Sequence, residues 1–163
     1  GRLPFQHHYY VKLVQVMGLP LSWGDDEGDM SIILFDEAQD SRPCVTAMLQ
    51  AQQGVQLVTV GDSAQSIFGF TGARDALPSF ACTPGTVSLS LTQTWRFGAN
   101  IAHAANTVLD LLNADIRLTP NPAIADTVST YDPATSVPVT DAVITRTNAE
   151  LIHFAIKHGL VVL

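Results

Sequence analysis

Residues 31–40 read SIILFDEAQD, and they give the clearest indication of the fold class. Ser31 to Phe35 form a short apolar run between acidic residues, which is typical of a strand that is buried on both faces of a parallel sheet. Asp36 and Glu37 follow the run directly. Ligands of open α/β folds bind at the carboxyl ends of the strands, so we expect both carboxylates to face one crevice there.

Nucleotide hydrolysis needs two such carboxylates in different roles. One holds Mg²⁺, usually through water, because Mg²⁺ dehydrates reluctantly. The other orients or deprotonates the attacking water. Taken alone, the stretch leaves a second interpretation open, in which two acids merely end a strand at the solvated rim of the sheet.

Strand and helix patterns alternate along the rest of the chain. Helices are predicted at 9–17, 42–53, 98–113 and 148–158, and strands at 31–35, 56–60, 86–91, 127–131 (an edge strand) and 142–145. We expect Asn148 to cap the last helix and Gly159 to end it. This alternation predicts an α/β fold with a parallel sheet and flanking helices.

The composition is that of a globular protein with few charges. Hydrophobic residues make up 47% of the 163 positions and charged residues 14%, against about 25% charged residues in a typical soluble domain. The net charge of −7 argues against autonomous DNA binding, because a free-standing nucleic-acid binder usually carries a basic surface. The sequence has no membrane-span or signal-peptide pattern and no CxxC pair, so we expect an intracellular protein. The chain ends, Gly1 and a strand-like run at 159–163, suggest a piece of a larger protein.

Four motifs follow one another in order: DEAQD at 36–40, VGDSAQSIFGFTGA at 60–73, LTQTWRFG at 91–98 and RTNA at 146–149. Together they resemble the UvrD/Rep/PcrA-like helicases of superfamily 1A, and among these the F-box DNA helicase branch. The resemblance implies a P-loop NTPase fold of the RecA-like type. Residues 1–91 would be the C-terminal part of the first RecA-like lobe (1A), and residues 92–163 the incomplete start of the second (2A).

The resemblance also implies a role in ATP hydrolysis for five residues. Asp36 would hold Mg²⁺ through water, and Glu37 would activate the attacking water. Gln65 would sense the γ-phosphate and link its presence to the DNA-facing surface. Trp95 would stack on adenine, and Arg96 would reach the γ-phosphate across the cleft between the lobes.

The implied DNA contacts come from aromatic residues and from the RTN motif. Phe68 and Phe70 match the aromatics of motif III, and Phe70 matches the position that stacks on a base of single-stranded DNA. Arg146 and Asn148 match the motif that lines the DNA track on the second lobe. Stacking needs no basic patch, so DNA binding is compatible with the acidic net charge. Packing roles for Phe68 and Trp95, and a surface charge for Arg146, stay open as alternatives.

The resemblance implies a DNA helicase that couples ATP hydrolysis, with Mg²⁺, to 3′–5′ movement along single-stranded DNA in repair or recombination. Its partners would be single-stranded DNA and duplex junctions. Position 71 is Thr where the family pattern has Arg, and the 163 residues contain neither a GxxxxGK[ST] phosphate loop nor motifs V and VI. We therefore expect the chain alone to be inactive. A helicase-like interaction module that does not hydrolyse ATP, and the helicase part of a helicase–nuclease, remain open.

Overall fold

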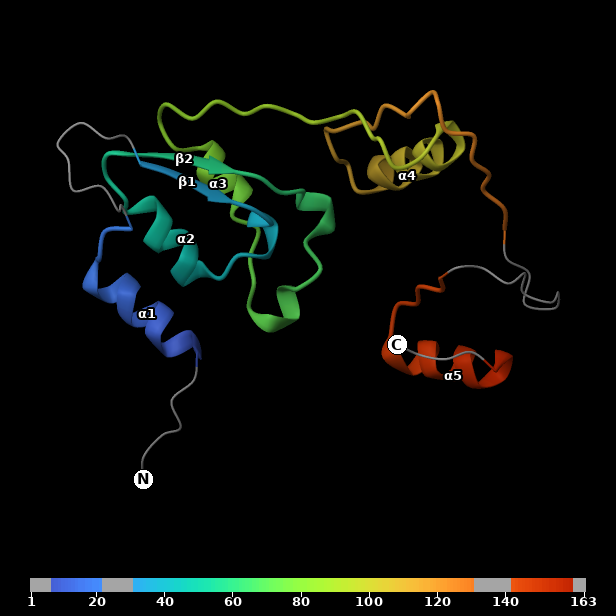
Figure 1. Ribbon diagram of the computed structural model, residues 1–163, viewed down its shortest axis with the longest axis horizontal. Coiled ribbons are helices and arrows are strands. Elements are labelled where there is room, and N and C mark those ends of the chain that lie inside the picture. The colour runs from blue at the N-terminus through green and yellow to red at the C-terminus, as the bar shows by residue number, and fades with distance from the viewer. Residues whose placement is uncertain (1–6, 22–30, 131–141, 160–163) are drawn as a thin grey trace. The chain divides into compact units, whose positions relative to one another are not determined.

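The structure is a computed structural model that describes residues 7–21, 31–130 and 142–159 (Figure 1). It forms two compact units, Gly1–Asp126 and Thr127–Leu163, and each is described by itself. The α-helices are α1 (His7–Met17), α2 (Pro43–Gln50), α3 (Leu77–Ala81), α4 (Ala99–Leu111) and α5 (Asn148–His158). The strands are β1 (Ser31–Phe35) and β2 (Val55–Thr59), and the short 3₁₀ helices are η1 (Ala38–Asp40), η2 (Ser63–Gln65) and η3 (Gly69–Thr71).

β1 and β2 pair in parallel, in a register that runs from Ser31 opposite Val55 to Phe35 opposite Thr59. The backbone pairing continues past both strands, because Val60 N donates to Phe35 O (2.8 Å) and Ala38 N donates to Val60 O (3.0 Å). The ends of the two strands therefore meet at one edge of the sheet. The predicted α/β class with a parallel sheet is confirmed.

The hydrophobic core lies on one face of this sheet. Leu49 of α2 and Phe80 of α3 are buried together with Ala76. Partly buried apolar side chains from both strands and the neighbouring segments pack against them, namely Leu21, Ile33, Phe35, Val45 and Leu57. The Phe35 and Phe80 rings meet edge to face, with centroids 6.2 Å apart. Two helices thus cover one side of the strands.

The opposite face of the sheet is open, which corrects the prediction that residues 31–35 are buried on both faces. Ile32 is 57% exposed, Leu34 78% and Val58 38%. The physical reason is that the buried core of α2 and α3 packs against the side of the strands that carries Ile33, Phe35 and Leu57. The apolar run therefore alternates between inward and outward side chains, as it does in any strand with one covered face.

The predicted helices are confirmed to within three residues at each end, apart from one cap. α5 begins with a capping box formed by Thr147 and Glu150 instead of the expected Asn148 cap. Thr147 Oγ1 accepts from Glu150 N (3.2 Å), and Glu150 Oε2 accepts from Thr147 N (3.1 Å). These two hydrogen bonds satisfy the N–H groups of Thr147 and Glu150. Thr147 is therefore the N-cap, and Asn148 is the first helical residue. Gly159 ends α5 with a φ of 63°, as predicted.

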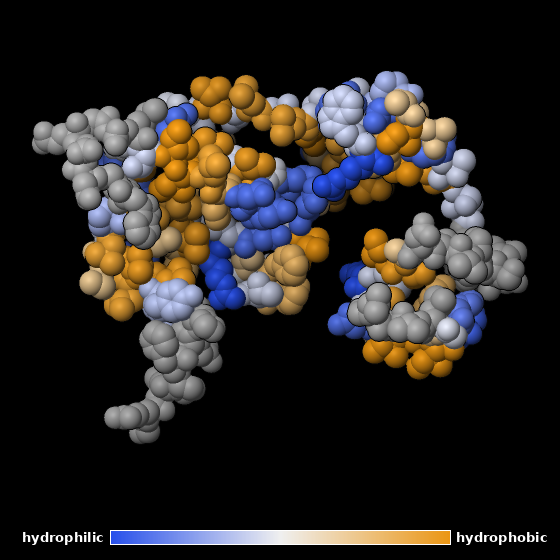
Figure 2. Space-filling view, in the orientation of Figure 1, coloured by the Kyte–Doolittle hydropathy of each residue, from blue (hydrophilic) through white to orange (hydrophobic). Residues whose placement is uncertain are grey.

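Three predicted strands are absent from the described residues: 86–91, 127–130 and 142–145 are not strands. Val87, Leu89 and Leu91 alternate in the sequence but are 79%, 86% and 82% exposed. Figure 2 shows hydrophobic residues, in orange, along this extended segment at the top of the view. An alternating pattern becomes a strand only when a neighbouring strand accepts its backbone hydrogen bonds, and none in the described part of the chain does so. Tyr131 and residues 160–163 lie outside the described residues.

The described helices include none that is both long and apolar enough to cross a membrane. The lobe boundary near residue 91 remains a prediction.

Candidate functional site

Asp36 and Glu37 lie at the carboxyl edge of the sheet, as the sequence predicts. β1 ends at Phe35, and the chain turns at Glu37, whose backbone is left-handed (φ 52°, ψ 42°). This region costs a residue with a side chain about 1–2 kcal/mol, and such strain concentrates at functional sites. Glu37 N donates to Asp36 Oδ1 (2.9 Å), and both side chains are exposed. The turn thus presents two adjacent carboxylates to solvent.

Gln39 connects the DEAQD motif to the loop that follows β2. Its side chain is 2% exposed. Its Nε2 donates to Glu37 Oε2 (2.5 Å), and its Oε1 accepts from Asp62 N (3.0 Å). Ser66 Oγ also donates to the carbonyl oxygen of Gln39 (3.1 Å). No local pattern in the sequence indicates this role for Gln39, because its partner Asp62 lies 23 positions away.

Gln65 lies in the same hydrogen-bonded network. It belongs to η2, whose N-cap is Asp62. Asp62 accepts with both carboxylate oxygens: Oδ1 from Ala64 N (2.9 Å) and Oδ2 from Gln65 Nε2 (2.7 Å). A chain of hydrogen bonds therefore runs from Glu37 through Gln39 and Asp62 to Gln65. The structure brings three predicted site residues, Asp36, Glu37 and Gln65, to one edge of the sheet.

Phe68 and Phe70 extend this edge through η3. Phe68 N donates to Asp40 Oδ1 (3.4 Å), which connects the aromatic loop back to the DEAQD motif. The two rings lie 6.2 Å apart at an angle of 41°. Phe68 is 45% exposed and Phe70 86% exposed. The open face of Phe70 is available for stacking, whereas Phe68 is half covered.

The side chains along this edge are mostly acidic. The carboxylates of Asp36, Glu37, Asp40 and Asp62 belong to the two motifs that meet there. Among the described residues, only Arg117 and Asp110 form an ion pair, and they lie in another segment. The structure's described part also contains no cluster of three or more metal-ligating side chains. Mg²⁺ in nucleotide sites is typically held by one or two carboxylates together with the substrate's phosphates, so a single strand-end carboxylate is a suitable protein ligand.

Trp95 and Arg96 lie in the segment that leads into α4, and Thr119 holds this segment in place. Thr119 N donates to Thr92 O (2.8 Å), and Thr94 N donates to Thr119 O (2.9 Å). Trp95 is 73% exposed. Arg96 N donates to Thr94 Oγ1 (3.2 Å), while the guanidinium side chain is exposed. Both side chains are therefore presented outward from a hydrogen-bonded backbone.

Asp126 caps the start of α4, directly after these two residues. Its Oδ2 accepts from Gly98 N (2.7 Å) and Ile101 N (3.3 Å), and its Oδ1 accepts from Asn100 N (2.9 Å). Gly98 has no room for a side chain, since an added Cβ would lie 2.0 Å from the Ile124 carbonyl oxygen. Sequence reasoning missed this cap, because an aspartate so far along the chain carries no local signal.

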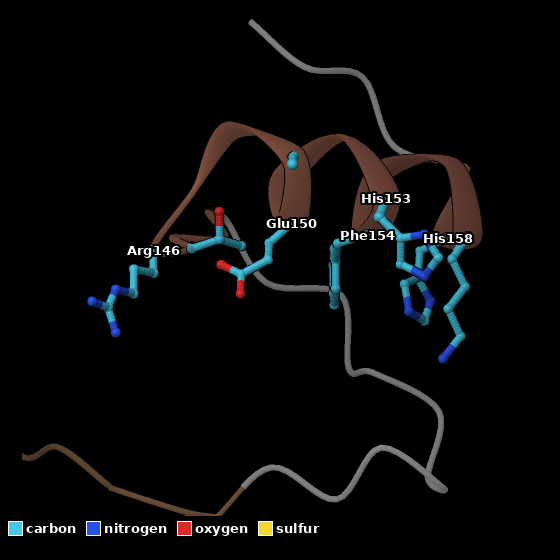
Figure 3. Close-up of a pocket in the computed structure, with 8 residues that line it drawn as sticks. Arg146, Glu150, His153, Phe154 and His158 are labelled. Atoms are coloured by element: carbon cyan, nitrogen blue, oxygen red, sulfur yellow. The ribbon is translucent and has the colours of Figure 1, made fainter.

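In the second unit, Arg146 lines an open pocket along α5 (Figure 3). Arg146 lies at one end of the pocket, and His153 and His158 lie toward the other. The remaining lining residues are Thr145, Ala149, Glu150, Phe154 and Lys157. Asn148 is the first residue of α5 and is not part of this lining. Arg146 and Asn148 thus share one helix start but do not form one pocket.

Comparison with known proteins gives a family match, and the curated relatives that match include two F-box DNA helicases. Residues 27–77, which include the DEAQD and GDSAQ motifs, match the UvrD/REP helicase N-terminal domain. F-box DNA helicase protein 1 of Schizosaccharomyces pombe is 36% identical over 109 residues, which cover 67% of this chain and 12% of that protein. F-box DNA helicase 1 of Gallus gallus is 36% identical over 102 residues, which cover 63% of this chain and 9% of that protein. The resemblance inferred from the motifs is confirmed.

Proposed function

Because residues 27–77 are a segment of the UvrD/REP helicase N-terminal domain family, we propose that this chain carries catalytic and DNA-contacting groups of an ATP-dependent DNA helicase. The family implies a P-loop NTPase fold, in which the β1–β2 pair would be part of the first RecA-like lobe. One observation carries the proposal: the DEAQD and GDSAQ motifs lie at one sheet edge and are hydrogen-bonded to each other.

The proposed ATPase chemistry assigns different roles to the two strand-end carboxylates. Asp36 would hold Mg²⁺ through water, and the bound ion would neutralise part of the charge on the phosphate oxygens. Glu37 would accept the proton of the attacking water, as its exposed position allows. The amide of Gln65 donates to Asp62 in this structure. With ATP bound, the amide would donate to the γ-phosphate instead.

Trp95 and Arg96 would complete the nucleotide site from the second lobe. The exposed indole of Trp95 offers a face for adenine. The exposed guanidinium of Arg96 would stabilise charge that develops on the γ-phosphate, a contribution of about 10³–10⁵ in rate in related NTPases. This role requires a lobe boundary ahead of Arg96, near residue 91.

Single-stranded DNA is the proposed track, with Phe70 as the principal stacking platform. Its exposure of 86% leaves the ring free to receive a base. Phe68 would support Phe70 from the side, while Arg146 and Asn148 would contact DNA from the second unit. Coupling of ATP turnover to Phe70 through the Gln65 loop would drive 3′–5′ movement, and the cellular role would be DNA repair or recombination inside the cell.

Glu37→Gln in the full-length protein tests the proposal. The amide keeps the shape of Glu37 but cannot accept a proton, so ATP turnover should fall by well over tenfold, a change of about 1.4 kcal/mol or more in barrier. Binding of ATP–Mg²⁺ should stay close to that of the unchanged protein. Steady-state ATPase assays and nucleotide titration measure both quantities. Turnover that survives the substitution would exclude Glu37 as the catalytic base.

A further inference from the structure

We infer that Gln39 is a positioning residue of the proposed ATPase, which holds the Glu37 carboxylate and ties it to the turn that carries Gln65. This inference rests on the proposed function, and it adds a role that the resemblance did not assign. It is supported by the burial of Gln39, by the polarity of its two side-chain hydrogen bonds and by the fit of its amide against Gly61.

The burial of Gln39 makes its hydrogen bonds obligatory. The residue is 2% exposed and has the largest fully buried side chain among the described residues. A buried amide that loses its partners cannot turn to water for replacements, so the unpaired state is disfavoured. The side chain is therefore confined to the arrangement in which Glu37 and Asp62 are both engaged.

The two partners of Gln39 also determine the orientation of its amide. The Glu37 carboxylate can only accept a hydrogen bond when ionised, and the backbone N–H of Asp62 can only donate one. The NH₂ end must therefore face Glu37, and the oxygen must face Asp62, as observed at 2.5 Å and 3.0 Å. A flipped amide would lose both bonds, so Gln39 holds Glu37 in one defined position.

The same arrangement links Glu37 to Gln65. Asp62 donates to Gln39 with its backbone N–H and accepts from Gln65 with its carboxylate. When Gln65 releases Asp62 to bind another partner, the turn that contains Asp62 shifts. The backbone N–H of Asp62, which donates to the amide of Gln39, then moves with it. Gln39 passes this shift to Glu37, which connects γ-phosphate sensing to the position of the base.

Gly61 leaves the space that this arrangement needs. A Cβ added at Gly61 would lie 2.4 Å from Gln39 Oε1 and 3.1 Å from Ala38 N. A side chain at position 61 would therefore displace the Gln39 amide from its hydrogen bonds, although Gln39 itself would be unchanged.

The test uses the full-length protein with Gln39→Met, which keeps the length of the side chain and removes both hydrogen bonds. Gln52→Met is the matched control, because Gln52 accepts from Leu21 N (2.7 Å) and donates to Met48 O (2.9 Å), with no contact to the carboxylate edge. The measured quantities are kcat with and without single-stranded DNA, KM for ATP, and Tm.

Gln39→Met should lower kcat by about tenfold or more while KM stays within about twofold, because a positioning group acts on the chemical step rather than on uniform binding. The ratio of DNA-stimulated to basal turnover should also fall, since the link between Gln65 and Glu37 is broken. Gln52→Met, which removes the hydrogen bonds of a half-buried amide, should lower Tm and leave kcat and this ratio unchanged. In the Glu37→Gln background, Gln39→Met should cause no further loss of residual turnover.

A kcat for Gln39→Met that stays within twofold of the unchanged protein would overturn the inference. An equal loss of turnover in Gln52→Met would also overturn it, since general destabilisation would then be the cause. If Gln39→Met does not fold, Gln39→Glu supports the same comparison, because it keeps the shape and the acceptor for Asp62 N–H but places a second carboxylate beside Glu37. Unchanged turnover in Glu37→Gln would instead refute the proposed function.

Discussion

At the scale of single residues, the carboxyl edge combines a strained backbone with a buried amide. Glu37 occupies the left-handed region although it is not glycine. The hydrogen bonds of Gln39 to Glu37 and Asp62 hold the turn in that conformation. Strain that the surrounding contacts maintain is typical of a site where a side chain must point in one direction. The edge therefore combines two solvent-exposed carboxylates with a hydrogen-bonded turn behind them.

Phe70→Ala should weaken binding of single-stranded DNA in the full-length protein by about 1–3 kcal/mol, the usual contribution of one stacked base. Affinity for ATP and the melting temperature should change little, because the ring is 86% exposed and packs little of the core. Fluorescence titration with a labelled oligonucleotide measures the loss.

Ile67→Ala is the control for Phe70→Ala, since Ile67 is an exposed apolar residue of the same loop (69%) without an aromatic face. Its DNA affinity should match that of the unchanged protein. If Phe70→Ala lowers the melting temperature as well as the DNA affinity, the result would favour a packing role for the ring.

At the scale of secondary-structure elements, α4 depends on a cap from a distant residue. Both Asp126 carboxylate oxygens accept from N–H groups in the first turn. A carboxylate here also interacts favourably with the positive end of the helix dipole. Because Trp95 and Arg96 immediately precede this turn, the cap sets the backbone from which both side chains project.

Asp126→Asn should destabilise the first turn of α4 by about 0.5–2 kcal/mol, since the amide has only one acceptor oxygen and no charge. Amide hydrogen exchange over residues 98–111 should become faster, and exchange in β1 and β2 should not. Asp110→Asn is the matched control, because Asp110 is an exposed partner of Arg117 and such surface pairs contribute little. Equal exchange rates in the two variants would contradict the capping role.

At the scale of the whole molecule, the proposed site contains groups that would act on a bound phosphate, but the 163 residues contain no phosphate loop that would hold one. The edge carboxylates are negative and have no basic partner within the described residues. The net charge of the chain is −7. A polyanion such as ATP is therefore repelled unless backbone N–H groups, a lysine and Mg²⁺ hold it, as a phosphate loop does.

The isolated 163-residue chain should therefore show no ATP turnover, and its affinity for ATP–Mg²⁺ should be millimolar or weaker, about 4 kcal/mol of binding or less. Titration calorimetry and an ATPase assay on the purified chain, with the full-length protein in parallel, measure both. Micromolar binding accompanied by turnover in the chain alone would show that these residues form a complete catalytic site.

Local patterns in the sequence predicted four of the helices, both strands of the sheet and the order of the motifs. The strand at residues 31–35, the strand that follows α2 and the helices at α1, α2, α4 and α5 were all predictable, because apolar period, proline at a helix start and glycine at a helix end are properties of neighbouring residues. Asp36 and Glu37 were placed at the sheet edge for the same reason, since they directly follow an apolar run.

Contacts between residues that are far apart in the sequence became visible only in the folded chain. The bond between Gln39 and Asp62 joins residues 23 positions apart, and the Asp126 cap reaches back 28 positions to Gly98. The segment 86–91 has a strand pattern but no strand partner, and Leu34 is apolar but exposed. Hydrogen bonding and burial depend on what another part of the chain places opposite a residue, and periodicity carries no information about that neighbour.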